Sequence, residues 1–415
     1  MTLIKTSILN GIAVIIKLLT FLGINKLLSL YVGPVGYAFL GQYQNLITVV
    51  TTFASGAINT GVTKYTAEYY DSEEKQHALW QTAVKIAVAG SLLMGFFLVF
   101  FRTSLAKTFL ENEELSAVFI WFAATLIFFV MNSLLLAILN GKKEIGLYVI
   151  ANITGSIFAL LSSAVLVIYF NLYGALVALA VYQSIAFFAT VFLCFKAPWF
   201  KYSYLLGRFD KKIAFSLFKY ALMAIVGALC APGTQILVRG YIGNVINWQA
   251  AGYIEAIWRI SAAYLMVVTA TLSVYFIPRL AELTERQHIR EELIKTYKLL
   301  IPFTMISATL IYLLRHFVIR WLFTEDFAGM DELFAWQMFG DSIKVASWVL
   351  MYLYMAKGLF RLYVFSEVFF SITFYLLVVL LEPQFQMRAV AIAHAINYLT
   401  YFSFGFYALK TKKII

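Results

Sequence analysis

Long apolar runs recur along almost the whole of this 415-residue chain. Most have about 20 residues or more, which is the length at which an α-helix crosses the hydrocarbon core of a bilayer. Hydrophobic residue types make up 62% of the chain and charged types 13%, against about 45–50% and about 25% in soluble globular proteins. A soluble fold could not bury this much apolar surface. The sequence therefore predicts a protein that lies within a membrane.

The apolar runs are predicted to be helices, because an open sheet edge cannot face lipid. The expected fold class is an all-α membrane protein with twelve transmembrane helices in two six-helix lobes. The helices are predicted near residues 7–30, 37–60, 77–100, 115–139, 146–170, 172–195, 212–238, 250–275, 292–314, 332–356, 361–381 and 387–409. The first run is long, has a lysine at its centre and precedes no small-residue cleavage site, so we expect no cleaved signal peptide.

Basic residues indicate the orientation in the membrane. On the loops and helix flanks, eighteen Lys and Arg residues fall on one side and six on the other. Because positive residues are retained on the cytoplasmic side, we expect a multi-pass protein with both termini in the cytoplasm. The same bias explains the net charge of +11 in a chain with so few charged residues. We therefore expect no nucleic-acid partner.

The longest connection, about 196–211, divides the predicted helices into two sets of six. Gly36-Tyr37 recurs as Gly252-Tyr253, and the pattern at 67–71 recurs in residue type at 281–285 at nearly the same offset. Six helices per half is an even number, so the halves share one topology. We expect an N-terminal lobe at 1–200 and a C-terminal lobe at 201–415, related by a pseudo-two-fold axis along the membrane normal.

Three charged residues are predicted to lie near the middle of the bilayer, where a charge costs several kcal/mol and needs a reason. Lys17 lies about ten residues from either end of its helix, too deep to reach the interface easily. Lys344 follows Asp341 by three residues on one helical face. In one interpretation, Lys17 and Lys344 line a cavity and bind an anionic substrate, and Asp341 takes part in coupling or gating. In the other, these residues only stabilise the fold, for example through an internal Asp341–Lys344 ion pair.

Other charges lie nearer the helix ends. Glu255 and Arg259 are four residues apart, in the favourable order for a helical pair. We expect Arg259 to bind substrate and Glu255 to take part in gating, although a local pair explains the spacing equally simply. Arg239 is a further substrate-binding candidate that could instead reach the interface. Glu367 is a candidate for coupling; it and His394 could carry a proton or could be satisfied core residues.

Some uncharged residues are also candidates. Gln44 and Asn45 could bind sugar hydroxyls or only join helices. Pro232, inside a predicted helix, frees a backbone carbonyl and indicates a bending point or a static kink. The chain has no Gly-rich phosphate loop, no HExxH and no CxxC pair, and its two cysteines lie inside apolar runs. We expect no cofactor, no bound metal and no catalytic residues.

Several stretches resemble the Wzx-type polysaccharide flippases of the multidrug/oligosaccharidyl-lipid/polysaccharide (MOP) exporter superfamily, in particular those of enterobacterial common antigen. They lie along the whole chain, and five of the charged residues match positions of the same type in those relatives: Lys17, Arg239, Asp341, Lys344 and Lys357. The stretches are Gly33-Pro34-Val35-Gly36, the run 59–65, Ser273-Val274-Tyr275 with Pro278, the run 283–285, Phe334-Ala335-Trp336-Gln337, Gly340-Asp341 and Lys344-Val345.

The resemblance implies a bacterial inner-membrane flippase. Its substrate would be an undecaprenyl-pyrophosphate-linked oligosaccharide (lipid III or an O-antigen unit), moved from the cytoplasmic to the periplasmic leaflet by alternating access. Membrane lipid is an implied partner, and a polysaccharide polymerase and a chain-length regulator are candidate partners. The alternatives are a cation-coupled multidrug exporter of the same superfamily, whose cavity should be acidic, and a membrane glycosyltransferase, which needs a larger periplasmic loop.

Overall fold

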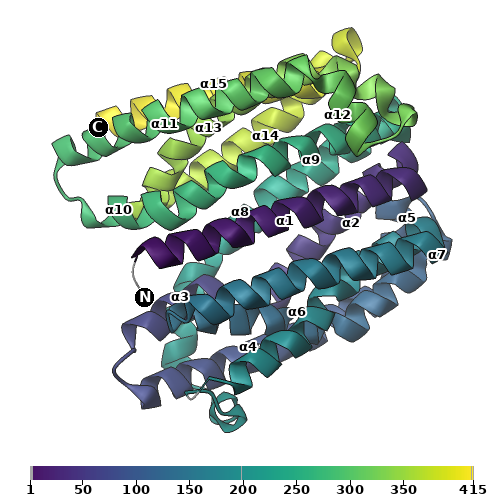
Figure 1. Cartoon of the computed structure of the whole chain (residues 1–415). Helices are drawn as coiled ribbons and strands as arrows, with labels where there is room; N and C mark the ends of the chain where they lie inside the picture. The colour runs from purple at the N-terminus through teal and green to yellow at the C-terminus, as the bar shows by residue number, and fades with distance from the viewer. Residues whose placement is uncertain (1–2, 198, 413, 415) are drawn as a thin grey trace. The chain divides into compact units, whose positions relative to one another are not determined.

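The computed structural model describes residues 3–197, 199–412 and 414, and within these residues the chain is helical with no strand (Figure 1). Fifteen α-helices are joined by short turns, 3₁₀ segments and one π-helical segment. Their bounds are α1 Leu3–Tyr31, α2 Gly33–Ala54, α3 Asn59–Glu68, α4 Glu73–Phe100, α5 Arg102–Leu110, α6 Ala117–Gly141, α7 Ile145–Phe195, α8 Lys211–Val245, α9 Trp248–Thr271, α10 Ile277–Glu282, α11 Arg286–Leu313, α12 Arg315–Leu322, α13 Phe334–Ala356, α14 Phe360–Phe385 and α15 Arg388–Thr411. The prediction of an all-helical membrane fold is confirmed.

Eight helices of the described chain are long and apolar enough to cross a membrane. The bent pair formed by α2 and α3 makes a ninth if it is counted as one span. Apart from two places, each apolar run predicted above overlaps a single helix of similar bounds. The exceptions are the end of the second run and the runs 146–170 and 172–195, which both fall in α7.

The helix predicted over the second run continues to residue 60, but the observed helix α2 ends at Ala54. Gly56 and Ala57 both have positive φ angles, 62° and 54°, which a right-handed helix cannot accommodate. The chain therefore turns at this point, and α3 leaves at an angle of 47° to α2. The predicted helix 37–60 is wrong in its last turn, because the glycine permits a left-handed backbone there.

Helix α7 consists of two helical segments that meet at Asn171, where φ is 48° and ψ is −129°. A Cβ added to Gly174 would lie 1.8 Å from the carbonyl oxygen of Leu166. In a straight helix, residues eight apart are separated by about 12 Å along the axis. The chain therefore folds back sharply at Asn171, and the segments on its two sides correspond to the two separate runs predicted there.

Contacts within the chain divide it into two compact units. Unit 1 comprises Met1–Val32 and Phe39–Pro232, and unit 2 comprises Gly33–Ala38 and Gly233–Ile415. In unit 1, α7 packs along both α6 and α1, and α4 packs along α6 (Figure 1). Apolar side chains of α6, such as Phe119 and Phe122, are fully buried in the core of this unit.

In unit 2, α13 packs against both α15 and α11, and α14 packs along α15. A π-helical segment, Leu272–Phe276, continues α9 into the short helix α10. The ammonium group of Lys357, just after α13, donates hydrogen bonds to the carbonyl oxygens of Leu280 (2.6 Å) and Leu283. These bonds satisfy carbonyls that the end of a helix leaves without partners, so Lys357 fixes the C-terminal end of α10.

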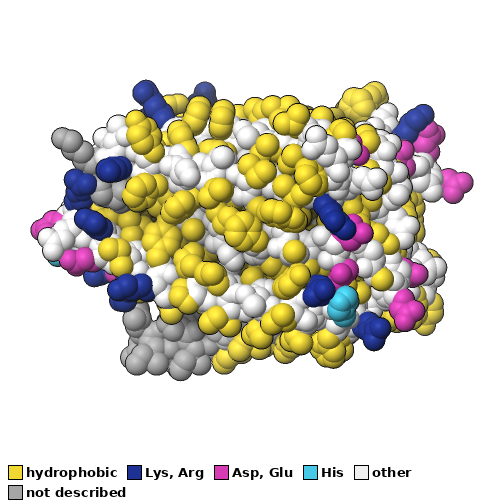
Figure 2. All heavy atoms as spheres, turned by 90° about the horizontal axis from the view of Figure 1, so that it is seen from above, with side chains coloured by type: hydrophobic (Ala, Val, Ile, Leu, Met, Phe, Trp, Pro, Cys, Tyr) yellow, Lys and Arg dark blue, Asp and Glu magenta, His cyan; other side chains and the backbone are white. Residues whose placement is uncertain are grey.

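The outer surface is that of a protein dissolved in lipid. Figure 2 shows one face, on which hydrophobic side chains cover the middle and most of the charged side chains lie toward the two ends. Among the most exposed side chains are Leu93, Phe96, Leu299 and Leu380, each with more than 60% of its surface uncovered. An apolar surface of this extent is stable only against hydrocarbon.

Candidate functional site

Two buried arginines of unit 2 share one carboxylate; we call these three residues the arginine cluster. Arg239 on α8 donates from Nη1 to Oε2 of Glu255 on α9, and Arg259, one turn further along α9, donates from Nε to Oε1 at 2.7 Å. All three side chains are at least 90% buried. Asn247 accepts a hydrogen bond from the backbone N–H of Ala250 and so caps the start of α9.

Aromatic rings complete the surroundings of the arginine cluster. The guanidinium of Arg239 lies 5.6 Å from the ring centre of Trp258, and that of Arg259 lies 5.3 Å from the ring centre of Tyr37. A ring face attracts a cation, most strongly where water is excluded. With two cations and one carboxylate, the cluster has a formal charge of +1. The arginine cluster therefore carries a buried net positive charge, which attracts an anion.

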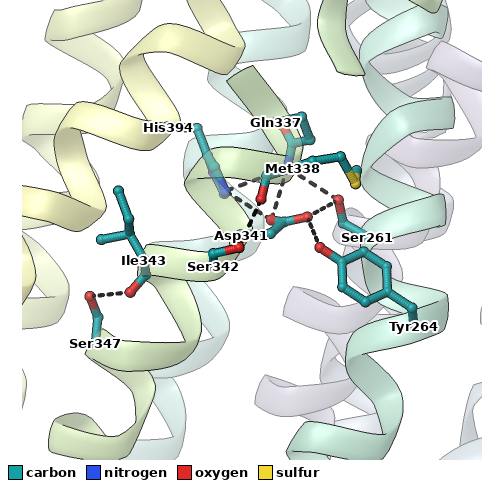
Figure 3. Close-up of polar contacts among 9 residues, drawn as sticks. All are labelled: Ser261, Tyr264, Gln337, Met338, Asp341, Ser342, Ile343, Ser347 and His394. Carbon is teal, nitrogen blue, oxygen red and sulfur yellow. Dashed lines mark hydrogen bonds and ion pairs between the residues drawn. The ribbon is translucent and has the colours of Figure 1, made fainter. Parts of the chain in front are cut away.

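A second buried network surrounds Asp341 of α13 (Figure 3); we call it the aspartate cluster. Oδ2 of Asp341 accepts from Ser261 at 2.5 Å and from Tyr264 at 2.8 Å, both on α9. Oδ1 accepts from Gln337 at 3.1 Å and lies 3.0 Å from Nε2 of His394 on α15. The carboxylate is fully buried, and hydrogen-bonding groups from three helices satisfy it.

Gly340 explains how His394 approaches Asp341. A Cβ on Gly340 would lie 2.5 Å from Cδ2 of His394 and 3.2 Å from the backbone of Ala395. Only glycine allows α13 and α15 to come this close. The close crossing places the imidazole beside the carboxylate of the adjacent residue.

Lys344, one helical turn from Asp341, makes no ion pair with it. Its ammonium nitrogen instead lies 4.9 Å from the ring centre of Trp348 and 5.5 Å from that of Tyr398. The side chain is partly exposed. The alternative of a direct Asp341–Lys344 ion pair is therefore wrong. The Asp341 carboxylate accepts hydrogen bonds from other residues, and the Lys344 ammonium group lies beside two aromatic rings.

The remaining candidates do not join these clusters. Lys17 is an exposed side chain of α1, and its ammonium group makes no hydrogen bond or ion pair with any described residue. Gln44 is exposed and Asn45 partly exposed on α2. These three belong to unit 1, whereas both clusters belong to unit 2.

Two gating candidates take different positions. Pro232 lies inside α8 at the boundary between the two units, and a Cβ added to Gly233 would meet no other part of the chain within 4 Å. Glu367 of α14 is partly buried and accepts a hydrogen bond from the Tyr401 hydroxyl at 3.4 Å.

Sequence reasoning found the Glu255–Arg259 pair but missed its third member. The expectation that Arg239 could reach the interface is wrong, because Arg239 is 1% exposed and bound to Glu255. The hydrogen-bond partners of Asp341 were also missed. Gly340 was the available signal, since a glycine beside a buried carboxylate indicates a close helix crossing.

Within the described chain, no group of three His, Cys, Asp or Glu residues is placed to hold a metal.

The fold matches solved structures of transporters. One is an inward-facing multidrug resistance MATE family transporter of the MOP superfamily, with a TM-score of 0.78 and 12% identity over 95% of both chains. Another is the lipid II flippase MurJ in an inward closed conformation, with a TM-score of 0.76 and 14% identity, covering 99% of this chain and 89% of that one. At these identities the likeness concerns the fold alone.

Sequence comparison reaches further. The chain is 30% identical to the lipid III flippases of Escherichia coli (strain K12) and Shigella flexneri over 406 residues, which cover 97% of this chain and of each relative. Residues 41–332 match the family model described as polysaccharide biosynthesis protein. The match spans well over half of the sequence and includes the whole arginine cluster, but of the aspartate cluster only Ser261 and Tyr264. The chain therefore belongs to the polysaccharide biosynthesis protein family.

Proposed function

We propose that this chain is a flippase that moves a lipid-linked oligosaccharide across a membrane, and that it is a transporter rather than an enzyme. The observation that carries the proposal is the 30% identity to lipid III flippases across almost the full length of both proteins. The substrate class proposed from this likeness is an undecaprenyl-pyrophosphate-linked oligosaccharide. Transport would run from the cytoplasmic to the periplasmic leaflet of a bacterial inner membrane.

The chemistry of unit 2 supports an anionic substrate. The arginine cluster keeps a formal charge of +1 in a buried position, and the Lys344 cation lies on two aromatic rings without a carboxylate partner. Guanidinium groups form the strongest hydrogen bonds with phosphate oxygens. We propose that these groups and Lys17 replace water around the pyrophosphate during transport, and that Gln44 and Asn45 contact sugar hydroxyls.

A drug exporter is the second candidate, because the MATE transporter shares the fold. A cation-binding exporter needs carboxylates open to its substrate. Asp341 and Glu255 are instead enclosed by their own partners, and the arginine cluster is net positive. These observations favour the flippase.

Movement would be alternating access between two lobes of six helices, with residues 1–200 forming the first and residues 201–415 the second. Twelve spans result if α2 with α3 is one span, α7 is two, and α13 and α15 are included. The two segments of α7, on either side of the break at Asn171, have about 25 residues each and are each about 37 Å long, enough to cross the roughly 30 Å of the hydrocarbon core, so α7 suits two spans. Both termini would be cytoplasmic. Pro232 and Gly233 would provide a bending point in α8, the first helix of the second lobe.

Coupling to a proton gradient is assigned to the aspartate cluster, with Glu367 as a further candidate. Asp341 and His394 share a hydrogen bond in which one proton can lie on either partner. A proton gained or lost here changes the attraction between α13 and α15, which cross at Gly340. The expected consequence is that Asp341→Asn transports without responding to a proton gradient, while Asp326→Asn, an exposed carboxylate of the same unit, responds normally.

The direct test is deletion of the gene followed by mass spectrometry of lipid-linked intermediates. A flippase deletion should accumulate the complete lipid-linked oligosaccharide and display none at the surface, and the wild-type chain should restore display. Drug sensitivity with intact glycans would instead support the exporter. Single glycan units displayed at the surface would point to a lost polymerase.

A further inference from the structure

Unit 1 contains an apolar groove at the point where α2 ends. The groove has a volume of about 510 Å³, within the range of roughly 300–1,000 Å³ typical of small-molecule sites. It is lined by side chains of α2, of the turn after it, of α4 and of the connection before α8. The lining residues are Phe53, Gly56, Lys85, Ile86, Ala89, Gly90, Leu93 and Phe209.

The backbone break after α2 builds this groove. Gly56 adopts a φ of 62° and turns the chain away, so that α2 stops beside α4. A Cβ on Gly90 would lie 2.3 Å from the carbonyl oxygen of Ala54, so Gly90 lets α4 touch the end of α2. Side chains of Phe53 and Leu93 stand on the two sides and are largely exposed.

Lys85 is the one charged side chain among the described lining residues. It is exposed and makes no hydrogen bond or ion pair with any described residue. Other cations lie close in sequence to the groove's edge: Arg208 precedes Phe209, and Lys211 follows it by two residues, both exposed. The intervening Asp210 accepts hydrogen bonds from the backbone N–H groups of Lys212 and Ile213 at the start of α8.

The connection is held against α4 at a level that sets the depth of Lys85. The backbone N–H of Asp210 donates to the hydroxyl of Thr82 at 3.1 Å, and Gly207 packs against the side chain of Gln81. A connection with this many charges belongs at the membrane interface. Lys85 lies three residues beyond Thr82, about 4.5 Å further along α4, and with the connection at the interface its ammonium group would be near the lipid phosphates.

We propose that this groove holds the lipid part of the substrate: the phosphate-proximal portion of a polyprenyl diphosphate chain lies between Phe53, Ala89 and Leu93, and Lys85 contacts the diphosphate. An open apolar groove beside several cations matches one apolar chain with a multiply charged head. The inference rests on the proposed function, because it states where that substrate docks before its oligosaccharide crosses.

The test is binding of undecaprenyl diphosphate, without sugar, to the purified full-length protein, measured by native mass spectrometry with phosphatidylglycerol as the competing lipid. Ala89→Trp fills the groove from an exposed position, and Leu92→Trp adds the same bulk to an exposed position of α4 outside the lining. Lys85→Gln removes the groove's cation, and Lys107→Gln removes an exposed lysine of α5. Thermal unfolding midpoints identify any variant that fails to fold.

We expect undecaprenyl diphosphate to bind at least fivefold more weakly to Ala89→Trp and to Lys85→Gln, and unchanged to the two controls. Equal binding to all variants overturns the proposal. So does phosphatidylglycerol that displaces undecaprenyl diphosphate at equal concentration, since the groove would then be a general anionic-lipid site. A flipping assay with the wild-type protein in vesicles separates the two claims. If binding depends on the groove but the wild-type protein does not flip lipid, the groove proposal is supported and the flippase proposal is removed. If the wild-type protein flips lipid and neither Ala89→Trp nor Lys85→Gln changes flipping or binding, the flippase proposal is supported and the groove proposal is removed.

Discussion

The two units treat charge in opposite ways. Among the described side chains of unit 1, no Lys, Arg, Asp, Glu or His is buried, and Lys17 and Lys85 are exposed. In unit 2, seven such side chains are buried: Arg239, Glu255, Arg259, Glu292, Asp341, Glu382 and His394. Unit 2 therefore satisfies its buried charges with contacts inside the protein, while unit 1 leaves Lys17 and Lys85 open to whatever lies outside the protein.

This difference separates two uses of a charge in a membrane. A buried and satisfied network has two defined arrangements, paired and broken, and can respond to a proton or a ligand. An open lysine has no internal partner to lose and can serve only as a contact for an external anion. We therefore propose coupling in unit 2 and the first capture of the lipid diphosphate in unit 1.

The largest expected effect is in the arginine cluster. Glu255→Ala leaves two buried guanidinium groups beside each other with no carboxylate, and breaking a buried pair in this way costs about 3–5 kcal/mol. We expect the free energy of unfolding in detergent to fall by this amount and the amount of protein in the membrane to fall with it. Thermal unfolding and membrane yield measure both.

Glu113→Ala is the matched control, since Glu113 pairs with Lys107 on the surface of unit 1, where both side chains are more than half exposed. The surface variant should unfold close to the wild type. If the two variants lost the same stability, the contrast between the units would have no energetic basis.

The next effect is in the aspartate cluster. Asp341→Asn keeps the shape but replaces one accepting oxygen with an NH₂ group, so hydrogen-bond donors meet at that position. Leaving buried polar groups unsatisfied costs about 1–3 kcal/mol. We expect thermal unfolding to show a loss of this size for Asp341→Asn and almost none for Asp326→Asn, whose carboxylate is exposed. An unchanged midpoint for Asp341→Asn would mean that the network contributes nothing to folding.

A smaller effect on stability distinguishes the two deep lysines. Lys344→Met loses contact with two rings, worth about 0.5–2 kcal/mol, and regains part of it by apolar packing. Lys17→Met removes an exposed cation and should change stability by less than about 0.5 kcal/mol. Both variants should nevertheless reduce surface glycan display by tenfold or more if the cations contact substrate. Normal display in both, with normal protein levels, would remove cationic recognition from the mechanism.

The sequence was sufficient to predict the helices because lipid imposes them. Any backbone group in hydrocarbon must be bonded within its own segment, so an apolar run of sufficient length has one solution. The predicted bounds of α11 and α15, for example, differ from the observed ones by a few residues. The break after α2 was missed because Ala57 takes a positive φ, for which alanine has no preference.

The contacts of the site were harder to predict, for a geometric reason. Glu255 and Arg259 are four residues apart on one helix, and helical spacing alone brings them together. Arg239 reaches the same carboxylate from α8, and His394 reaches Asp341 from α15, 53 residues further along the chain. Such meetings depend on how helices cross. No periodicity within one segment encodes them. The same limit applies to Tyr398 of α15 beside Lys344, but not to Trp348, which lies four residues from Lys344 on α13.

The smallest expected effect tests whether exposure alone explains the behaviour of unit 1. A double-mutant cycle on Lys107 and Glu113, whose charged groups are 3.3 Å apart, should give a coupling of about 0.2–1 kcal/mol at low salt. At 1 M salt the Debye length falls to about 3 Å, so this coupling should vanish.

The same cycle on Arg259 and Glu255 should keep most of its coupling in salt, because ions cannot enter a cluster that is at least 90% buried. A Lys107–Glu113 coupling that persisted at high salt would show that unit 1 shields its charges as unit 2 does, and Lys17 and Lys85 would then lose their special status as open cations.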